Sequence, residues 1–298
     1  MTFLSELSIN ISFKCNFLCR HCSVLGSPMY NTSLDIQLIE RAIKCAPPTV
    51  KMVVFTGGEP TLFPDKLTFG ISLAKQRGMK TRVVTNAWWA KTKNKAKEFL
   101  LSIGRPDELA VSYDEFHEPW LSKLGGIDLI FNALSAAKEL GITTHVLTDY
   151  KYADKFRGFA DYVISGDPQA VGRAEEIRSV RAVKIHRGCI VAGDAITVLP
   201  DGSVTLCCGH ILNLPSRRLI TVGSLKEKCL NEIIEDMLTG SLMWKLRIDG
   251  PSKMLEEIGA PEAAWSCEAC NILGAKYYGE VLKRWPKVGA RKTDVPPP

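Results

Sequence analysis

The chain has 298 residues, a length that fits two average domains or one α/β barrel. Apolar residues make up 46% and charged residues 23% of it, which excludes a disordered chain and a coiled coil. There is no run of about 18 apolar residues, and the start MTFLSELSIN lacks a basic segment ahead of an apolar one. A membrane span and a secretory signal are therefore not expected, and the net charge of +6 is too diffuse to indicate a partner.

Ten cysteines are the unusual feature of this composition. Without a secretory signal the protein is expected in the cytoplasm, where thiol buffers keep cysteines reduced. Structural disulfides are therefore not expected. Metal or redox chemistry is the default interpretation of the cysteine count.

Residues 1–168 alternate between β-rich runs and helical patterns. The predicted strands are Leu7–Phe13, Met52–Thr56, Arg82–Thr85, Leu109–Ser112, Thr143–Leu147 and Tyr162–Ile164. The predicted helices between them are Asp35–Cys45, Lys66–Arg77, Lys91–Leu101 and Asp128–Leu140, and the link from Asp149 to Ala160 has room only for a short helix. This alternation predicts parallel strands with right-handed crossovers. The fold class is α/β, a partial (β/α)6 TIM-type barrel with its active residues at the C-terminal strand ends.

The pattern changes after about Arg178, and we predict one domain of residues 1–178 and a second of residues 179–298. In the second, Ala195–Leu206 predicts a hairpin that turns at Pro200-Asp201-Gly202. Leu225–Leu238 and Leu273–Leu282 predict helices. Six of the ten cysteines lie in this region, which makes it a cysteine-rich hairpin-and-helix extension of the barrel.

The first cysteine cluster, Cys15, Cys19 and Cys22, follows the first predicted strand with the spacing C-x3-C-x2-C. Three thiolates cannot complete a tetrahedral zinc site, which needs a fourth ligand. They can hold three corners of a four-iron cluster and leave the fourth iron open to a ligand. A zinc knuckle completed by His21 or by a distant group is the alternative.

Polar and glycine residues follow the next three predicted strands. The segment Thr56-Gly57-Gly58-Glu59-Pro60 combines two glycines, which let backbone approach a ligand, with a carboxylate that can bind an ammonium. A plain turn before a helix is the alternative for this segment. Thr85-Asn86 and Ser112-Tyr113-Asp114 follow the third and fourth strands. Since the ends of successive strands meet at one face of a barrel, these side chains are expected to line one cavity.

The segments KCNFLCRHC, TGGEP, VTNA and SYD together resemble the radical S-adenosylmethionine (SAM) superfamily over roughly residues 1–175. The resemblance implies that Cys15, Cys19 and Cys22 hold a [4Fe-4S] cluster whose open iron binds the amine and carboxylate of SAM. It further implies SAM-binding residues, which are Gly57, Gly58 and Glu59 at the amine, Asn86, Ser112 and Asp114 near the ribose and methionine, and Arg173 at the carboxylate. His21 takes the position of a packing ring beside the last cluster ligand.

The chemistry that this resemblance implies is one-electron cleavage of SAM to methionine and a 5′-deoxyadenosyl radical. The radical abstracts a hydrogen atom from the substrate, while the protein supplies orientation and a dry pocket. An electron donor such as flavodoxin or ferredoxin is expected as a partner.

The second cysteine cluster, Cys189, Cys207, Cys267 and Cys270, suits either a zinc ribbon or a fully ligated four-iron cluster. Beside the first half of the chain, it resembles the auxiliary-cluster region called the SPASM domain. No cysteine follows Cys270, which resembles the shortened twitch form and implies one auxiliary [4Fe-4S] cluster held by these four thiolates. The separate Cys45 and Cys229 are expected to be buried small apolar residues.

Cys208 remains as a spare cysteine beside a predicted ligand. It can simply pack, or it can exchange with Cys207 as the ligand. The resemblance to radical SAM epimerases implies a sharper role, in which the Cys208 thiol returns a hydrogen atom to the substrate radical from the opposite face.

The leading hypothesis is therefore an epimerase that acts on a residue of a ribosomal peptide or related natural product. A twitch-type dehydrogenase of an aminocyclitol or sugar alcohol and a peptide-crosslinking maturase are the enzymatic alternatives. A zinc- or RNA-binding protein with a basic tail at residues 283–292 is the non-enzymatic one. Neither a membrane nor a nucleic acid is expected as a partner of the leading candidate. The chain starts close to the first strand, which leaves no room for an N-terminal peptide-recognition domain and weakens the peptide hypothesis.

Overall fold

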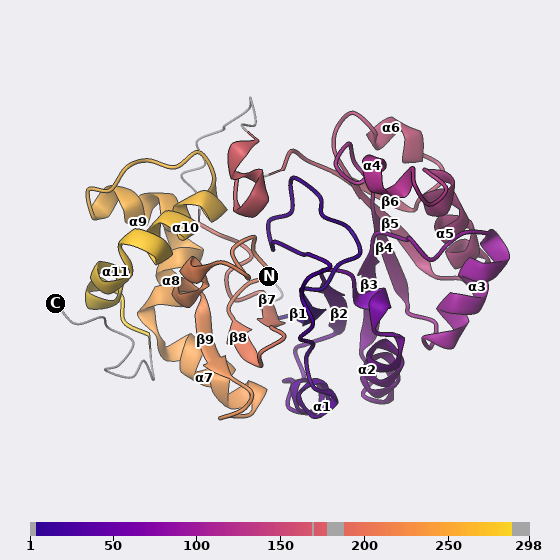
Figure 1. Cartoon of the computed structure of the whole chain (residues 1–298). Helices are drawn as coiled ribbons and strands as arrows, with labels where there is room; N and C mark the ends of the chain where they lie inside the picture. Colours follow the sequence, from indigo (N-terminus) through magenta and orange to yellow (C-terminus); the bar gives the residue numbers. More distant parts are fainter. Residues whose placement is uncertain (1–3, 169, 178–187, 288–298) are drawn as a thin grey trace.

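The computed structural model describes residues 4–168, 170–177 and 188–287 (Figure 1). Within them, nine strands form one sheet in the order β6-β5-β4-β3-β2-β1-β7-β8-β9. The strands are β1 (Glu6–Ser12), β2 (Met52–Gly57), β3 (Lys80–Thr85), β4 (Glu108–Ser112), β5 (Thr143–Thr148), β6 (Tyr162–Ser165), β7 (Ala195–Val198), β8 (Ser203–Thr205) and β9 (Thr221–Ser224).

The first six strands are parallel, and helices connect most of them. The helices of this half are α1 (Ile36–Lys44), α2 (Pro64–Gln76), α3 (Lys93–Ser102), α4 (Glu118–Leu121), α5 (Asp128–Glu139) and α6 (Ala153–Phe156), with the 3-10 turns η1 (Pro60–Leu62) and η2 (Gly172–Glu176). All six predicted strands and all four predicted helices of this half are confirmed to within a few residues. The single-turn α4 was not predicted, because four residues carry no periodicity that a sequence pattern can detect.

β1 shows why the two faces of the sheet differ. Leu7, Ile9 and Ile11 are fully buried in the hydrophobic core, and the residues that alternate with them include Ser8 and Asn10. Successive side chains of a strand point to opposite faces, so Ser8 and Asn10 face a cavity on the other side. Side chains from all six parallel strands line that cavity, so the sheet curls around it as a partial barrel.

The second half of the chain extends the same sheet. β7 pairs in parallel with β1, from Glu6↔Ala195 to Ile9↔Val198, and β8 and β9 continue in antiparallel pairing. The 3-10 turn η3 (Pro215–Leu219) and the helices α7 (Leu230–Thr239), α8 (Ser241–Ile248), α9 (Pro251–Glu257), α10 (Ser266–Lys276) and α11 (Tyr278–Arg284) complete this half, on the left of Figure 1. The predicted boundary between residues 178 and 179 and the last residues of the basic tail lie outside the described residues.

The predicted elements of this half are less accurate. α7 begins at Leu230 rather than Leu225, and the stretch predicted as one last helix spans the junction of α10 and α11. The sequence pattern missed β9, α8 and α9. No helix within the described ranges combines the length and apolar character needed to cross a membrane.

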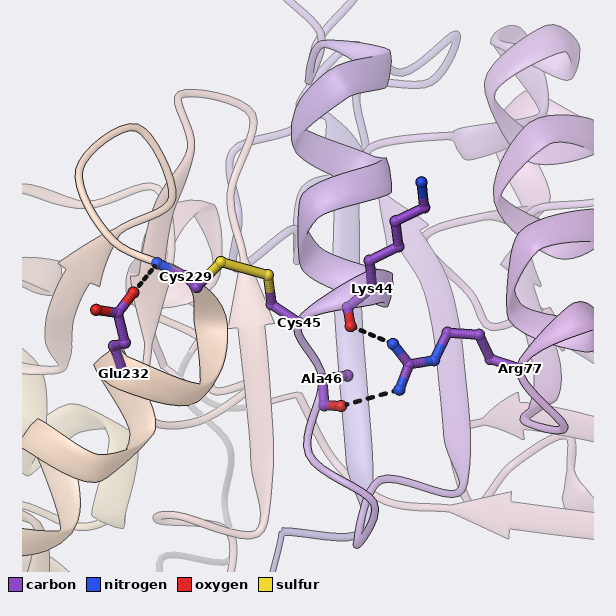
Figure 2. The surroundings of a disulfide bond; sticks show 6 residues. All are labelled: Lys44, Cys45, Ala46, Arg77, Cys229 and Glu232. Atoms are coloured by element: carbon purple, nitrogen blue, oxygen red, sulfur yellow. Dashed lines mark hydrogen bonds between the residues drawn. A yellow bond between two sulfur atoms is a disulfide. The ribbon is translucent and has the colours of Figure 1, made fainter.

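Cys45 and Cys229 form a disulfide bond (Figure 2), so the predictions that both are buried apolar residues and that no disulfide forms are wrong. Both side chains are partly exposed, and their Cα atoms lie 5.8 Å apart although 184 positions separate them in sequence. Cys45 caps the C-terminus of α1 and Cys229 caps the N-terminus of α7, where its N–H donates to Glu232 at 2.8 Å. The pairing was missed because it depends on α7 lying beside the end of α1, which no local pattern encodes.

Candidate active site

A cavity of about 340 Å³ lies at the C-terminal ends of the parallel strands. It brings together nine of the residues predicted from the sequence, which are Cys15, Cys19, Cys22, Gly57, Gly58, Glu59, Asn86, Ser112 and Arg173. We call it the upper cavity. Asp114, the tenth residue predicted for the cluster and SAM site, lines an adjoining cavity of about 260 Å³ instead.

The loop after β1 carries the first cysteine cluster and stands between the two halves of the molecule in Figure 1. Its thiols lie among backbone donors: Phe17 N–H donates to Cys15 Sγ at 3.4 Å and Gly26 N–H donates to Cys22 Sγ at 3.2 Å. Burial, followed by the nearby carboxylate of Glu59, raises the pKa of the Cys15 thiol to about 12. Burial, followed by the other two thiols, also raises the pKa of Cys19.

These three thiols fit an iron–sulfur cluster. Burying three thiolates side by side is costly unless a cationic group offsets their charge, and iron supplies that charge. With three protein ligands, one iron would stay open toward the upper cavity.

Arg173 of η2 holds the cysteine loop in place. Its Nε donates to the carbonyl of Cys19 at 2.9 Å, and its Nη2 donates to the carbonyl of Gly26 at 2.7 Å. Its own N–H donates to the carbonyl of Cys22 at 3.2 Å. The side chain therefore positions the loop as well as lining the cavity, and its predicted role at the SAM carboxylate stays a prediction.

Gly57 and Gly58 are required where β2 passes the end of β1. Gly57 has φ +138°, and a Cβ there would lie 2.3 Å from the carbonyl oxygen of Ser12. A Cβ on Gly58 would lie 2.3 Å from the carbonyl oxygen of Lys14. Only glycine permits this contact between the two backbones, and it leaves the β2 end open to a ligand.

Glu59 is buried, with 1% of its surface exposed, and it is engaged by four donors. Oε1 accepts from Thr61 N–H at 3.1 Å, from Thr61 Oγ1 at 2.5 Å and from Thr85 Oγ1 at 2.8 Å, while Oε2 accepts from Asn86 N–H at 2.8 Å. Burial still raises the pKa of this carboxyl above its ordinary value. Glu59 therefore ties the end of β2 to the end of β3, and the predicted contact with an ammonium would add to that role.

Asp114 joins two histidines beside the cysteine loop. Its Oδ1 lies 2.8 Å from His117 Nδ1 and its Oδ2 lies 3.1 Å from His21 Nε2. Burial raises the pKa of Asp114, but the hydrogen bonds from His117 and His21 outweigh it and hold the pKa well below its usual range. His21 stacks on Phe116 with ring centroids 4.8 Å apart, in line with its predicted packing role.

A zinc site built on the same loop has one candidate set among the described residues. Ligand atoms of Cys19, His21 and His117 lie within 4.8 Å of one another. Both histidines already bond Asp114 through one ring nitrogen, and Cys15 and Cys22 would be left without metal. The donor chemistry of three neighbouring thiols therefore favours the iron cluster over zinc.

The four cysteines of the predicted second cluster lie within electrostatic range of one another. Burial and then the thiols of Cys267, Cys207 and Cys189 raise the pKa of Cys270 well above its ordinary value. The C-x2-C pair occupies the start of α10, and His210 Nδ1 lies 3.4 Å from Cys267 Sγ. His210 also lines the upper cavity, so it connects this cysteine group to the candidate SAM site.

A second cavity, of about 290 Å³, lies inside the barrel below the first, and we call it the lower cavity. The two cavities share four lining residues, which are Thr56, Gly57, Val84 and Leu147. Cys208 lines the lower cavity and is exposed, whereas its neighbour Cys207 is only 9% exposed. The two adjacent cysteines therefore face different surroundings.

Sequence analysis missed several residues of this site. Glu6, Arg82 and His145 line the lower cavity, and His117 and His210 line the upper one. The strand patterns held a usable signal, because each of Glu6, Arg82 and His145 directly precedes a fully buried apolar residue of its strand, and these apolar residues are Leu7, Val83 and Val146.

A partial α/β barrel with three neighbouring thiols beside a cavity at its strand ends is the arrangement expected of a barrel enzyme that binds an iron–sulfur cluster. The profile of the radical SAM superfamily matches residues 9–151 of the chain. The matched segment, just under half of the chain, runs from β1 to the end of β5 and contains the first cysteine cluster, so this part of the barrel is similar to the radical SAM superfamily.

Three similar proteins extend the comparison beyond the barrel. YydG of Bacillus subtilis (strain 168), whose name assigns it provisionally to peptide biosynthesis, is 22% identical over 297 residues, 90% of this chain and 91% of YydG. SuiB of Streptococcus suis bound to S-adenosylmethionine superposes with a TM-score of 0.55 at 16% identity, over 78% of this chain. The chain spans 65% of the SuiB structure. AnSMEcpe with bound AdoMet and Cp18Cys peptide superposes with a TM-score of 0.55 at 14% identity, over 94% of this chain and 98% of its own.

Proposed function

We propose that this enzyme epimerises one residue of a ribosomal peptide or a related natural product, with Cys208 as the hydrogen donor. A peptide substrate is supported by the likeness to YydG over nearly its whole length. SuiB has also been solved with its precursor peptide SuiA, in a structure that superposes on 79% of this chain with a TM-score of 0.53.

The observation that carries the epimerase proposal is the exposure of Cys208 in the lower cavity, next to the upper cavity. A substrate carbon held between the two would face the SAM position on one side and this sulfur on the other. Although Cys208 is exposed toward the cavity, the surrounding protein partly desolvates its sulfur, and this effect, followed by the nearby charge of Glu6, raises the pKa of the thiol to about 11. The sulfur therefore keeps its hydrogen at neutral pH.

When bound, the cluster and SAM supply a carbon radical that removes one hydrogen atom from the substrate. The Cys208 S–H bond then breaks and a new C–H bond forms on the opposite face of the substrate carbon. The sulfur is left one electron and one proton short, and both must return before the next turnover. A one-electron donor of the flavodoxin or ferredoxin class supplies the electron in this scheme.

Cys189, Cys207, Cys267 and Cys270 are proposed to hold an auxiliary [4Fe-4S] cluster of the twitch type. Cys207 is buried and the other three are half-buried, and burial together with neighbouring thiols raises the pKa of Cys207 and Cys270, which supports a shared cationic ligand. Cys207 adjoins Cys208 in the chain, which offers a short path for the returning electron. A cytoplasmic location belongs to the same proposal, since eight cysteines are free thiols in this structure and a reducing compartment keeps them so, while the Cys45–Cys229 disulfide would have to resist the thiol buffers there.

The test compares wild-type enzyme with Cys208→Ala after anaerobic reconstitution to roughly eight irons per chain. Both proteins should cleave SAM to 5′-deoxyadenosine. In D2O, wild type should place one deuterium at the inverted carbon, and Cys208→Ala should lose at least about 99% of the inverted product because the hydrogen donor is gone. Mass spectrometry and chiral amino-acid analysis of the product measure both effects.

Ser72→Ala is the matched control, since it also removes one side-chain heteroatom and Ser72 is exposed on α2 outside both cavities, and it should keep inversion and deuterium uptake. Normal inversion by Cys208→Ala would remove this cysteine from the mechanism. A product two hydrogens lighter without deuterium would indicate a dehydrogenase. Bound zinc without iron would indicate the non-enzymatic alternative.

A further inference from the structure

The floor of the lower cavity is charged. We use the name charged floor for three residues that line this cavity, Glu6 of β1, Arg82 of β3 and His145 of β5. Glu108 of β4 does not line the cavity but contacts Arg82 and His145. Arg82 Nε donates to Glu108 Oε2 at 2.7 Å, and His145 Nε2 lies 3.1 Å from the same oxygen. Glu6 is held more loosely, since its Oε2 lies 3.5 Å from Arg82 Nη1.

The charges of this floor do not cancel. Arg82 carries one positive charge against the two carboxylates, and its closer contact is with Glu108. Burial, and next the charge of Arg82, lowers the pKa of His145, so this ring adds no positive charge at neutral pH. Asp194 on the β7 side places a further negative charge near Glu6. Glu6 is therefore the less compensated of the two carboxylates, since its partner Arg82 bonds Glu108 more closely, and burial, with Asp194 and Glu108 nearby, raises the pKa of Glu6 above its ordinary value despite Arg82.

Two polar side chains above Glu6 on β1 also lack partners. Ser8 and Asn10 are each only 2% exposed and line the cavity. No hydrogen bond joins either side chain to another group within the described part of the chain. Their polar atoms open into the cavity, so they are free to hydrogen-bond water or a ligand that enters it.

The walls of the same cavity are largely aliphatic. They are formed by Val24, Val54, Val84, Ala110, Leu147, Ile164 and Leu212. An alkyl chain fits such walls better than a polyhydroxylated ring does, since each ring hydroxyl would need its own partner. The cavity therefore has largely aliphatic walls, and the Glu6 carboxylate lies at one end of it.

We propose that the lower cavity receives a substrate side chain with an aliphatic stem and a cationic tip, an ammonium or guanidinium, and that Glu6 is its counter-ion. This inference rests on the proposed peptide substrate and names the residue type that the enzyme selects. Ser8 and Asn10 hydrogen-bond the bound residue above the tip. The backbone carbon of that residue then lies near Cys208 and the junction of the two cavities.

Protection of Cys208 from alkylation tests this inference without turnover. The reconstituted enzyme with SAM, but no reductant for the cluster, is treated with N-ethylmaleimide, and mass spectrometry follows modification of Cys208. The probes are acetyl-Gly-Lys-Gly-amide and acetyl-Gly-norleucine-Gly-amide at equal concentration, which differ by the ammonium group. The lysine peptide should slow alkylation about threefold to tenfold more than the norleucine peptide, the effect expected of one partly buried ion pair.

Glu6→Gln should reduce this preference to about onefold, because the counter-ion is gone. Glu40→Gln is the matched control, since Glu40 pairs with Lys44 on the surface of α1, and it should keep the preference. If Glu6→Gln does not fold, the two probes on the wild-type enzyme still decide the question. The inference would be overturned if both peptides protected equally, if the norleucine peptide protected better, or if neither protected. The aminocyclitol 2-deoxystreptamine is tested as a third probe, and protection by it alone would also overturn the inference.

The two proposals fail separately. If the lysine peptide protects Cys208 but the enzyme inverts no residue, the epimerase proposal falls and the cationic preference stands. If inversion occurs on a peptide whose modified residue is aliphatic and the lysine peptide gives no protection, only the present inference falls.

Discussion

At the scale of single residues, the approach of β2 to the cysteine loop depends on Gly58. Its N–H donates to the carbonyl of Ser12 at 2.7 Å, and a Cβ on Gly58 would lie 2.3 Å from the carbonyl oxygen of Lys14. The atoms that an added Cβ would meet belong to the backbone, which cannot move aside as the end of a flexible side chain can. We expect Gly58→Ala to lower the free energy of unfolding by about 2 kcal/mol or more and to reduce iron bound after reconstitution. Thermal unfolding and iron analysis measure the two effects.

Gly279→Ala is the control for this substitution. Gly279 lies in α11, and no heavy atom lies within 4 Å of the Cβ position, so alanine should raise helix stability by up to about 1 kcal/mol. Unchanged iron content and stability in Gly58→Ala would show that the loop can move away from β2.

At the scale of secondary-structure elements, two aspartates clamp neighbouring strands in the same way. Asp161, just before β6, accepts from Thr144 N–H at 2.8 Å and from Thr144 Oγ1 at 2.7 Å on β5. Asp107, just before β4, accepts from Thr81 N–H and Oγ1 on β3, both at 2.8 Å. Each clamp fixes the register of two neighbouring parallel strands at the N-terminal end of the barrel strands.

The clamp at Asp161 makes stability depend on pH. The hydrogen bonds from Thr144 lower the pKa of Asp161 in the folded protein. A lowered folded-state pKa stabilises the fold above the ordinary value near 4, and this contribution is lost as the pH falls through the folded pKa. Asp161→Asn should therefore cost about 1 kcal/mol at pH 7 and less at pH 3, as measured by urea unfolding at both values.

Asp154→Asn serves as the comparison, because Asp154 is 82% exposed and its ion pair among the described residues is with Arg157 on the surface. It should change stability by less than about 0.5 kcal/mol at either pH. An equal loss at pH 7 and pH 3 for Asp161→Asn would contradict an ionised clamp.

At the scale of the whole molecule, the Cys45–Cys229 disulfide links the barrel to the C-terminal half, which already share one sheet. A bond that closes so long a stretch of chain removes much freedom from the unfolded state. Cys45→Ser should lower the free energy of unfolding by about 3–5 kcal/mol without reductant. Wild type treated with a phosphine reductant should fall to the same level, as measured by urea unfolding. Equal stability of wild type and variant without reductant would show that the bond does not form in solution.

The sequence by itself determined the parallel half of the fold and nine of the residues that line the upper cavity. Local alternation sets strands such as β1, and the C-x3-C-x2-C spacing follows from chain geometry within one loop. The tertiary structure decided what depends on distant segments meeting. The Cys45–Cys229 pair, the clamp of Arg173 on the cysteine loop and the separate surroundings of Cys207 and Cys208 are of this kind. The charged floor belongs here too, because only the curvature of the sheet brings Glu6, Arg82 and His145 of three strands to one cavity.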